Sequence, residues 1–219
     1  MAAFPSTGIL TLFPPPAENP LYESGRWAQL NLDRPPMQKI ATGPTTGAAT
    51  DSEHGNPNYS YWAQETFSTD SGPVEVWACT AGGQLGAALE TWRVFLAITL
   101  GDRWSGYLAY YGGGIGKGFA IRRYDDGNAG FFGIAGSGGG YPDKLGLRIN
   151  GGEVECWAEF GGVWAMQCSA SDGAYRGNFY LGIGIEDPTA GGLSFPCFGG
   201  GKPHRTQIYR ILPAIADAV

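Results

Sequence analysis

The sequence is poor in charge, and its few charges lean to the acidic side. Only 16% of its 219 residues are Asp, Glu, Lys or Arg, well below the roughly 25% of an average globular domain. The 14 basic residues are outnumbered by 20 acidic ones, and the net charge is -6. Because nucleic acids and anionic membranes are bound through clusters of Lys and Arg, this composition argues against both as partners.

The sequence also lacks a long hydrophobic run and a secretory signal. No apolar run approaches the roughly 20 residues of a transmembrane helix, so no membrane insertion is expected. The N-terminal stretch MAAFPSTGILTLFPPP has no Lys or Arg, and proline interrupts its apolar part. A secretory signal needs a basic start and an unbroken apolar segment. We therefore expect a protein that is made in the cytoplasm and has no signal peptide.

Cysteine is scarce, and its spacing does not fit a metal site. The chain has four cysteines, Cys79, Cys156, Cys168 and Cys197. No CxxC or Cys/His pair has metal-ligand spacing, and we expect reduced thiols, since cysteine is commonly a small buried hydrophobe. A hairpin around Gly161-Gly162 with a two-residue loop would place Cys156 opposite Gln167. A disulfide to Cys168 would then require a bulge or a three-residue turn, because a one-residue slip reverses the face of a side chain.

Glycine, proline and aromatic residues are abundant. The chain has 37 Gly and 15 Pro, yet 43% of its residues are hydrophobic and 13% aromatic. Disordered chains lack that much apolar surface. Many turns together with many aromatics predict an all-β protein of numerous short strands. The length fits one domain.

From residue 59 onward, hydrophobic and polar residues alternate with period two, as they do in half-buried strands. The dipeptides Asp126-Gly127 and Asn150-Gly151 are strong hairpin signals between such runs. Strands at this spacing predict a sandwich or a barrel. The predicted strands cover residues 27–32, 37–41, 59–67, 74–80, 92–100, 106–111, 118–124, 130–135, 144–149, 153–160, 163–170, 177–185, 193–198 and 205–212.

The two ends of the chain differ from the middle. Residues 1–26 are rich in proline and predict an extended N-terminal arm, followed by the sandwich over 27–212 and a C-terminal tail over 213–219. An extended apolar segment can add a strand to a neighbour's sheet edge or lie in a groove on a partner. The alternative is that both ends pack on their own domain. The residues expected to act in assembly are Phe4, Ile9, Leu10, Leu12 and Phe13.

Residues 143–187 carry a more specific pattern. A strand with the sequence LGLRI is followed by an NGG turn, a hairpin, a Trp-containing strand, an Asp172-to-Tyr175 turn and a strand with the sequence LGI. This order resembles the concanavalin A-like lectin/glucanase and laminin-G sandwich. The resemblance implies a jelly roll of two large antiparallel sheets.

A second resemblance lies near the N-terminus. The stretches FPSTGILTLF (4–13), ENPLYESGRWAQL (18–30) and YWAQETF (61–67) resemble a family of bacteriophage minor tail or virion-surface proteins, although LFPPPA departs from that family's pattern. The resemblance implies a virion structural protein on tail or capsid, made in the host cytoplasm. Its partners would be other virion proteins, in a homo-oligomeric arrangement, with host-surface glycan as a further ligand.

Several residues of the sequence are of the types that catalyse glycoside hydrolysis or nucleophilic reactions. Glycosidases of this fold carry carboxylates at alternate strand positions, and Glu153, Glu155 and Glu159 share one face by period two. Because apolar residues separate them, we interpret them as the solvated face of an ordinary strand. His54 and His204 lie in polar loops, and GGGIGKG (112–118) lacks the Ser or Thr and the helix of a phosphate-binding loop. We expect a non-enzyme without cofactor or metal; the alternatives are a glycoside hydrolase or lyase of the same fold and a free-standing lectin.

A carbohydrate site needs aromatic faces beside carboxylate or amide groups. The candidate aromatics lie in or near glycine-rich turns, and the candidate polar residues lie in the following loop. The alternative is that these aromatics cover sheet faces and the polar residues build turns. Calcium, which some members of this fold bind, needs several converging oxygens, and no dense acidic loop is present. The glycan candidates are Trp104, Tyr107, Tyr110, Tyr111, Tyr141, Asp125, Asp126 and Asn128.

Overall fold

The computed structural model describes residues 9–13, 16–30, 36–41, 47–51, 58–81, 91–112, 118–136, 141–186 and 193–202. Besides strands, these residues contain a short 3-10 helix, η1 (Thr69–Ser71). The strands are β1 (Ile9–Thr11), β2 (Trp27–Gln29), β3 (Met37–Ala41), β4 (Gly47–Asp51), β5 (Asn58–Trp62), β6 (Phe67–Ser68), β7 (Val74–Ala81), β8 (Thr91–Thr99), β9 (Ser105–Gly112), β10 (Gly118–Asp125), β11 (Asn128–Gly136), β12 (Lys144–Asn150), β13 (Glu153–Phe160), β14 (Val163–Ser171), β15 (Asn178–Glu186) and β16 (Ser194–Gly201).

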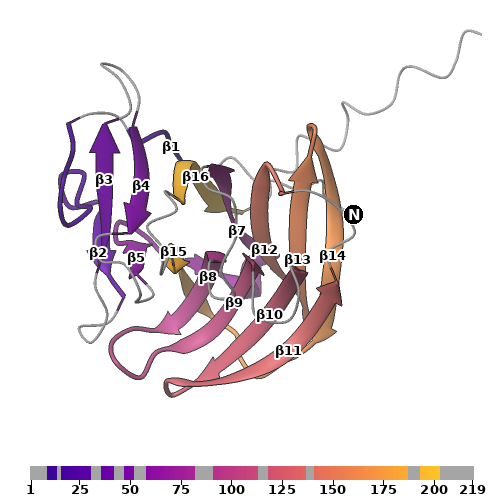
Figure 1. The fold of residues 1–219 in the computed structure, drawn as a ribbon. Helices are drawn as coiled ribbons and strands as arrows, with labels where there is room; N and C mark the ends of the chain where they lie inside the picture. Colours follow the sequence, from indigo (N-terminus) through magenta and orange to yellow (C-terminus); the bar gives the residue numbers. More distant parts are fainter. Residues whose placement is uncertain are drawn as a thin grey trace, which may run out of the picture.

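The strands form two antiparallel sheets that pack against each other (Figure 1). Sheet A has the order β14-β13-β12-β7-β16-β4-β3, with β1 paired to β16. Sheet B has the order β11-β10-β9-β8-β15-β5-β2, with β6 paired to β15. In Figure 1, β12 to β14 stand on the right, and β8 to β11 cross the lower front. The arrangement confirms the predicted all-β sandwich of two antiparallel sheets.

The core between the sheets is built from the alternate residues that period two turns inward. In β7, Val74, Val76 and Ala78 are buried in this core, so Glu75, Trp77 and Cys79 face outward from sheet A. Facing strands contribute a similar set of inward residues, and each buried aliphatic side chain contributes roughly 1.5–3 kcal/mol relative to an exposed one. The set includes Leu145, Leu147, Ile149, Val94, Leu96, Leu181 and Ile183.

Two glycines within strands allow large rings to contact the backbone of a neighbouring strand. A Cβ atom at Gly199 would lie 2.4 Å from the ring of Trp77, and one at Gly182 would lie 2.0 Å from the ring of Phe95. Real Cβ atoms do not approach other atoms that closely, so a larger residue at either position would displace the ring. Both rings lie on the outward faces of their sheets, where glycine in the neighbouring strand allows them to approach its backbone closely.

The hairpins follow the predicted turns, with one change of register. Asp126 (φ 51°) and Gly127 (φ 81°) form the β10–β11 turn, as their sequence predicts. In the β13–β14 hairpin, Phe160 pairs with Val163, but a β-bulge beside Cys156 places Cys156 opposite Cys168. The expected pairing of Cys156 with Gln167 is therefore wrong, because a bulge adds one residue to one strand.

The N-terminal segment packs on its own sandwich from residue 9 onward. Strand β1 pairs with β16, and Ile9 and Phe13 are buried in the main core. Further along, Lys39 forms ion pairs with Glu18 and Glu23, at 3.3 and 3.6 Å. These contacts follow the alternative in which the chain end packs on its own domain. Ile9 and Phe13 are therefore not exposed for assembly, because the main core of their own chain buries them.

The remaining assembly candidates differ from these two. Leu10 and Leu12 are 58% and 61% exposed, since period two turns them away from the core. Phe4, the predicted strand at 205–212, the tail at 213–219, His54 and His204 lie outside the described residues, as does most of the GGGIGKG stretch.

The predicted strand over 59–67 is divided into β5 and β6. Strand β5 pairs with β15 from Asn58 to Tyr61, and the Ala63 N–H then donates to the carbonyl of Arg26 instead. Strands β1 and β4 were not predicted, and the strand predicted at 27–32 ends at Gln29. The alternation of apolar and polar side chains does not indicate where the backbone hydrogen bonding of a strand begins or ends.

The cysteines are in two different states. Cys79 and Cys197 form a disulfide between the adjacent strands β7 and β16, at a separation of 118 positions in the sequence. The expectation of reduced thiols is therefore wrong for this pair, because sheet order, which the sequence pattern does not reveal, sets β7 beside β16. Cys156 and Cys168 are free thiols.

Candidate carbohydrate-binding face

The predicted glycan residues do not form one site, because period two divides them between the two faces of sheet B. Tyr107 and Tyr111 point into the main core, where they are almost completely buried. Neighbouring rings surround them: Tyr111 lies 4.7 Å from Phe119, and Tyr107 lies 5.6 Å from Tyr175, between ring centroids. Neither tyrosine presents a ring face to a ligand.

Trp104 is also buried, on the outward face of sheet B. Its ring stacks on Tyr124 at 4.2 Å and lies 5.6 Å from Phe95. Leu30, Tyr59, Phe95, Ala97, Trp104 and Leu108 form a second small apolar cluster there. Trp104 is therefore a packing residue, as the structural alternative expected.

The β8–β9 connection holds this second cluster in place. The Gly101 N–H donates to the Leu30 carbonyl at 2.9 Å, and the Gly127 N–H donates to the Trp104 carbonyl at 3.0 Å. These bonds tie the connection to two other loops. Because the loop lies over Phe95 and Leu108, this part of sheet B has no exposed aromatic face.

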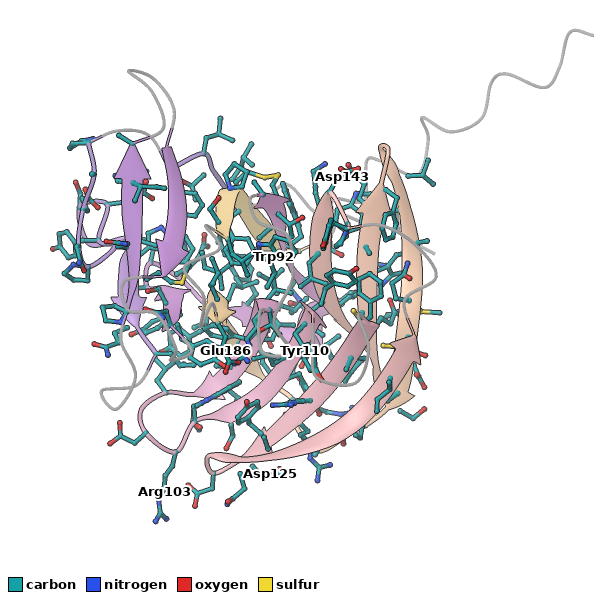
Figure 2. The ribbon with its side chains drawn as sticks, in the orientation of Figure 1. Trp92, Arg103, Tyr110, Asp125, Asp143 and Glu186 are labelled. Carbon is teal, nitrogen blue, oxygen red and sulfur yellow. A yellow bond between two sulfur atoms is a disulfide. The ribbon has the colours of Figure 1, made fainter. Side chains whose placement is uncertain are left out.

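Two of the predicted aromatics remain partly accessible, at separate places. Tyr110 lies on the outward face of sheet B, with the guanidinium of Arg122 stacked 5.1 Å from its ring centroid. Tyr141 is 39% exposed and packs edge-on against Trp92. Figure 2 labels Tyr110 and Trp92 near the centre of the molecule.

The predicted polar residues form the β10–β11 turn and its supports. Asp125 accepts hydrogen bonds from the Tyr175 hydroxyl and from Arg123, and these interactions lower the pKa of Asp125. Asp126 pairs with Arg103 at 3.3 Å, and the Asn128 amide donates to the Asp125 carbonyl at 3.4 Å. In Figure 2, Arg103 and Asp125 lie at the lower end of the molecule and Asp143 at the upper end. The residues build a turn, as their alternative interpretation expected.

A different cluster lies on the outward face of sheet A. Glu155 and Glu159 are each only 7% exposed, so their interpretation as a solvated strand face is wrong. Arg148 Nε donates to Glu75 Oε2 at 2.7 Å, and Arg148 also pairs with Glu155 at 3.8 Å. The burial follows from this ladder of charges across β7, β12 and β13, because each charged group is covered by its partners.

Tryptophan rings are interleaved with these charges. The guanidinium of Arg148 lies 5.2 Å from the centroid of the Trp157 ring, and Trp157 Nε1 donates to Glu155 at 2.8 Å. These contacts orient the Trp157 ring, which is half-buried on β13.

One lysine links the other two tryptophans. Lys144 Nζ lies 5.8 Å from the Trp77 ring centroid and 5.9 Å from that of Trp164. The same ammonium donates to both carboxylate oxygens of Glu159, at 2.7 and 2.9 Å. Strand pairing sets this arrangement, since Lys144 and Trp164 both lie opposite Glu159. We call this cluster the tryptophan face; its residues are Glu75, Trp77, Lys144, Arg148, Glu155, Trp157, Glu159 and Trp164.

The accessible part of the tryptophan face lies toward the edge strand β14. Trp77 is nearly buried against Gly199, whereas Trp157 and Trp164 are half-buried, and Met166 beside them is 51% exposed. Lys144 has three N–H donors, of which Glu159 engages two. Partly exposed indole rings beside an ammonium donor and carboxylate acceptors can stack on a sugar ring and bond its hydroxyls.

Sequence reasoning identified the glutamates of this face but not its tryptophans. The sequence does contain a signal for Trp157. It stands at an alternate position of one strand together with Glu153, Glu155 and Glu159, and so shares their face. The partners from β7 and β12 could not be inferred, because strand order in the sheet is not visible in the sequence.

Two kinds of feature are absent from the described residues, a cluster of metal-ligating side chains and a membrane-spanning helix. No three His, Cys, Asp or Glu side chains in these ranges gather closely enough to hold a metal ion. Within the same ranges, no helix has the length and apolar character needed to cross a membrane.

Comparison with known proteins shows the fold. No protein-family model matches the chain, and no curated protein matches it significantly. The calcium- and mannose-bound VIP36 exoplasmic/lumenal domain superimposes with a TM-score of 0.58 at 11% identity, covering 92% of each chain. The potassium-bound carbohydrate recognition domain of Emp46p gives a TM-score of 0.58 at 10% identity, covering 82% of this chain and 89% of the other. The chain therefore has the concanavalin A-like lectin fold expected from residues 143–187.

Proposed function

We propose that this protein is a non-enzymatic carbohydrate-binding module whose ligand lies on the tryptophan face. The observation that carries the proposal is a pair of half-buried indoles on adjacent strands, each beside paired charges. Trp164 lies beside the Lys144–Glu159 pair. Trp157 lies beside Arg148 and Glu155. The rings supply apolar stacking surface, and the paired charges supply fixed donors and acceptors for hydroxyl groups. The sandwich fold, shared with the VIP36 and Emp46p domains, is compatible with this role.

The experiment is a glycan array with the purified chain and the variants Trp157→Ala and Trp164→Ala. Since removal of a stacking ring at a binding site typically costs more than 1 kcal/mol, each variant should lose about tenfold in affinity or more. Tyr141→Ala is the matched control, because Tyr141 is an exposed aromatic outside the face, and it should bind normally. Binding that persists undiminished in both tryptophan variants contradicts the assignment of the face.

The surroundings of the glutamates favour binding over hydrolysis. Glycoside hydrolysis requires two carboxyl groups that flank the scissile bond, one of them acting as an acid. Here Glu155 and Glu159 are directed to separate cations on β12, Arg148 and Lys144. Release of reducing ends from a glycan that the protein binds, abolished by Glu159→Gln, would overturn the non-enzymatic assignment.

We further propose that the module is carried on a bacteriophage virion, on tail or capsid, where it contacts host-surface glycans. The support is the sequence resemblance of residues 4–13, 18–30 and 61–67 to virion-surface proteins. Partners would be other virion proteins in a homo-oligomeric arrangement, and the exposed Leu10 and Leu12 are the described assembly candidates. Mass spectrometry of purified particles tests the idea: we expect the chain at stoichiometric amounts, and its absence from particles would leave the free-standing lectin.

A further inference from the structure

The hairpin of β13 and the edge strand β14 carries a second pair of cysteines in a geometry suited to a disulfide, with Cys156 on β13 and Cys168 on β14. The β-bulge beside Cys156 places Cys156 opposite Cys168 in the β13–β14 ladder. Residues directly opposed in antiparallel strands have Cα atoms about 4.5–5.5 Å apart, within the range of about 4.4–6.8 Å that disulfides span. Cys79 and Cys197 form the disulfide of the same sheet from an equivalent opposed position, with a Cα–Cα distance of 5.0 Å.

The two thiols are in contact but unbonded, and they differ in access. Cys156 is fully buried in the core, while Cys168 is only partly buried on the edge strand. A hydrogen bond links their sulfur atoms; it lowers the pKa of Cys168 and raises that of Cys156. The less buried cysteine is thus the one with more thiolate character, and the thiolate is the attacking species in disulfide exchange.

We propose that Cys156 and Cys168 are an oxidation site, at which a low-molecular-weight disulfide such as oxidised glutathione converts the two thiols into a second disulfide of sheet A. In the first step, the Cys168 thiolate attacks one sulfur of the small disulfide and releases one thiolate. In the second step, Cys156 gives up its proton to the solvent, attacks the Cys168 sulfur of the mixed disulfide and releases the second thiolate. Two protein thiols are oxidised, and one disulfide is reduced to two thiols.

The new bond would tie β14 to β13 beside the tryptophan face. The bulge that brings the cysteines together immediately precedes Trp157, and Trp164 lies on the strand that the bond would hold. A disulfide restricts the opening of the segment it closes. The amide hydrogens of β14 should therefore exchange with solvent more slowly, by a factor of up to about ten. Any effect on glycan affinity rests on the proposed function, whereas the oxidation itself does not.

The test uses the full chain, treated with oxidised glutathione, then unfolded in acidic urea, alkylated with iodoacetamide and digested with trypsin. Arg148 and Arg176 bound one tryptic peptide that contains both cysteines, and no Lys or Arg lies between them. We expect this peptide to lose both alkyl groups and to be lighter by two hydrogens than the reduced peptide. Two alkyl groups after treatment, or a stable glutathione adduct on Cys168, would overturn the proposal.

Two variants separate the roles of the cysteines. Cys156→Ser should stop at the mixed disulfide and retain glutathione on Cys168, because no second thiol is present to displace it. In Cys168→Ser, glutathione should not react with Cys156, and iodoacetamide should reach it only once the protein is unfolded, because Cys156 is fully buried. Glutathione on Cys156 in the second variant would contradict Cys168 as the point of entry. These masses are measured without glycan, so failure of glycan binding would leave their interpretation unaffected.

Discussion

The outward faces of the two sheets carry similar residues but differ in how far their aromatic rings are covered. Both carry aromatic rings and arginine in alternate positions, and on both a ring lies against an in-strand glycine. On sheet B, the β8–β9 connection covers the rings and makes a second apolar core around Trp104. On sheet A, the rings are separated by ion pairs, and the edge near β14 stays partly exposed.

The difference shows that an aromatic residue beside a turn does not by itself indicate a binding surface. Trp104 follows a glycine-containing turn and is buried because its own loop folds back over the sheet. Trp157 lies mid-strand among charged groups that pair with one another, and its ring stays half-buried. The character of the neighbouring strands decides which face is available.

The largest expected effect of a single substitution is that of Trp104→Ala. Removing this buried ring opens a cavity beside Phe95 and should lower the free energy of unfolding by about 3–5 kcal/mol. Urea denaturation measures the change. Glycan binding by the folded fraction should be unchanged, and lost binding in a variant that remains folded would move the site from sheet A to sheet B.

Arg148→Ala tests the buried ion pairs on the outward face of sheet A, where sheet B has its second apolar cluster. The substitution leaves the fully buried Glu75 without its arginine, and loss of one partner of a buried pair costs about 3 kcal/mol or more. The same measurement on Arg148→Met combined with Glu75→Gln and Glu155→Gln should recover much of the loss, because no unpaired charge is left. A single variant as stable as the parent would show that the ladder is not energetically important.

Lys144→Met should have a smaller effect on stability and a clear effect on binding. Lys144 is partly exposed but Glu159 is nearly buried, so loss of the pair should cost about 1–3 kcal/mol, because one buried carboxylate loses its donor. The methionine side chain would still pack between Trp77 and Trp164. Glycan affinity should fall by about tenfold, since a charged hydrogen-bond donor is removed. Calorimetric titration with a ligand from the array measures it. Unchanged affinity would show that Lys144 does not contact the sugar.

The smallest effect concerns the acid stability of the β10–β11 turn at the end of sheet B. The pKa of Asp125 is lowered below its ordinary value of 3.8 by Tyr175 and Arg123. Its contribution is therefore fully present above that value and is lost as the pH falls through the lower pKa of the folded state. Asp125→Asn should flatten the loss of stability below pH 3.8, with Asp126→Asn as the control. An identical acid profile in parent and Asp125→Asn would contradict this linkage.

Much of the fold could be predicted because period two is a local property. The strands from Val74 to Glu186 appear near their predicted positions, and the turn at Asp126-Gly127 forms where its sequence requires positive φ. The order of the strands could not be predicted, since it depends on contacts between distant residues. The Cys79–Cys197 disulfide and the Glu75–Arg148 pair both follow from that order.

The candidate site was predicted less well than the fold. Loop composition suggested Trp104 and the aspartates of the β10–β11 turn, but loop residues are also the ones that build turns and cover sheets. The alternation of Glu155, Trp157 and Glu159 was a better signal, because residues that share a face of one strand stay together whatever the strand order. It lacked the partners on β7 and β12.

Both ends of the described chain meet on one strand of sheet A. Ile9 pairs with Gly200, and the last described residues, Gly201 and Lys202, follow directly on β16. Tension applied through the two ends would therefore separate β1 from β16 one residue pair at a time. Cys197 is covalently joined to β7, so the load would next meet a cross-link in the sheet. A tethered molecule could thus yield at its short first strand while Trp157 and Trp164, on β13 and β14, lie away from the path of the force.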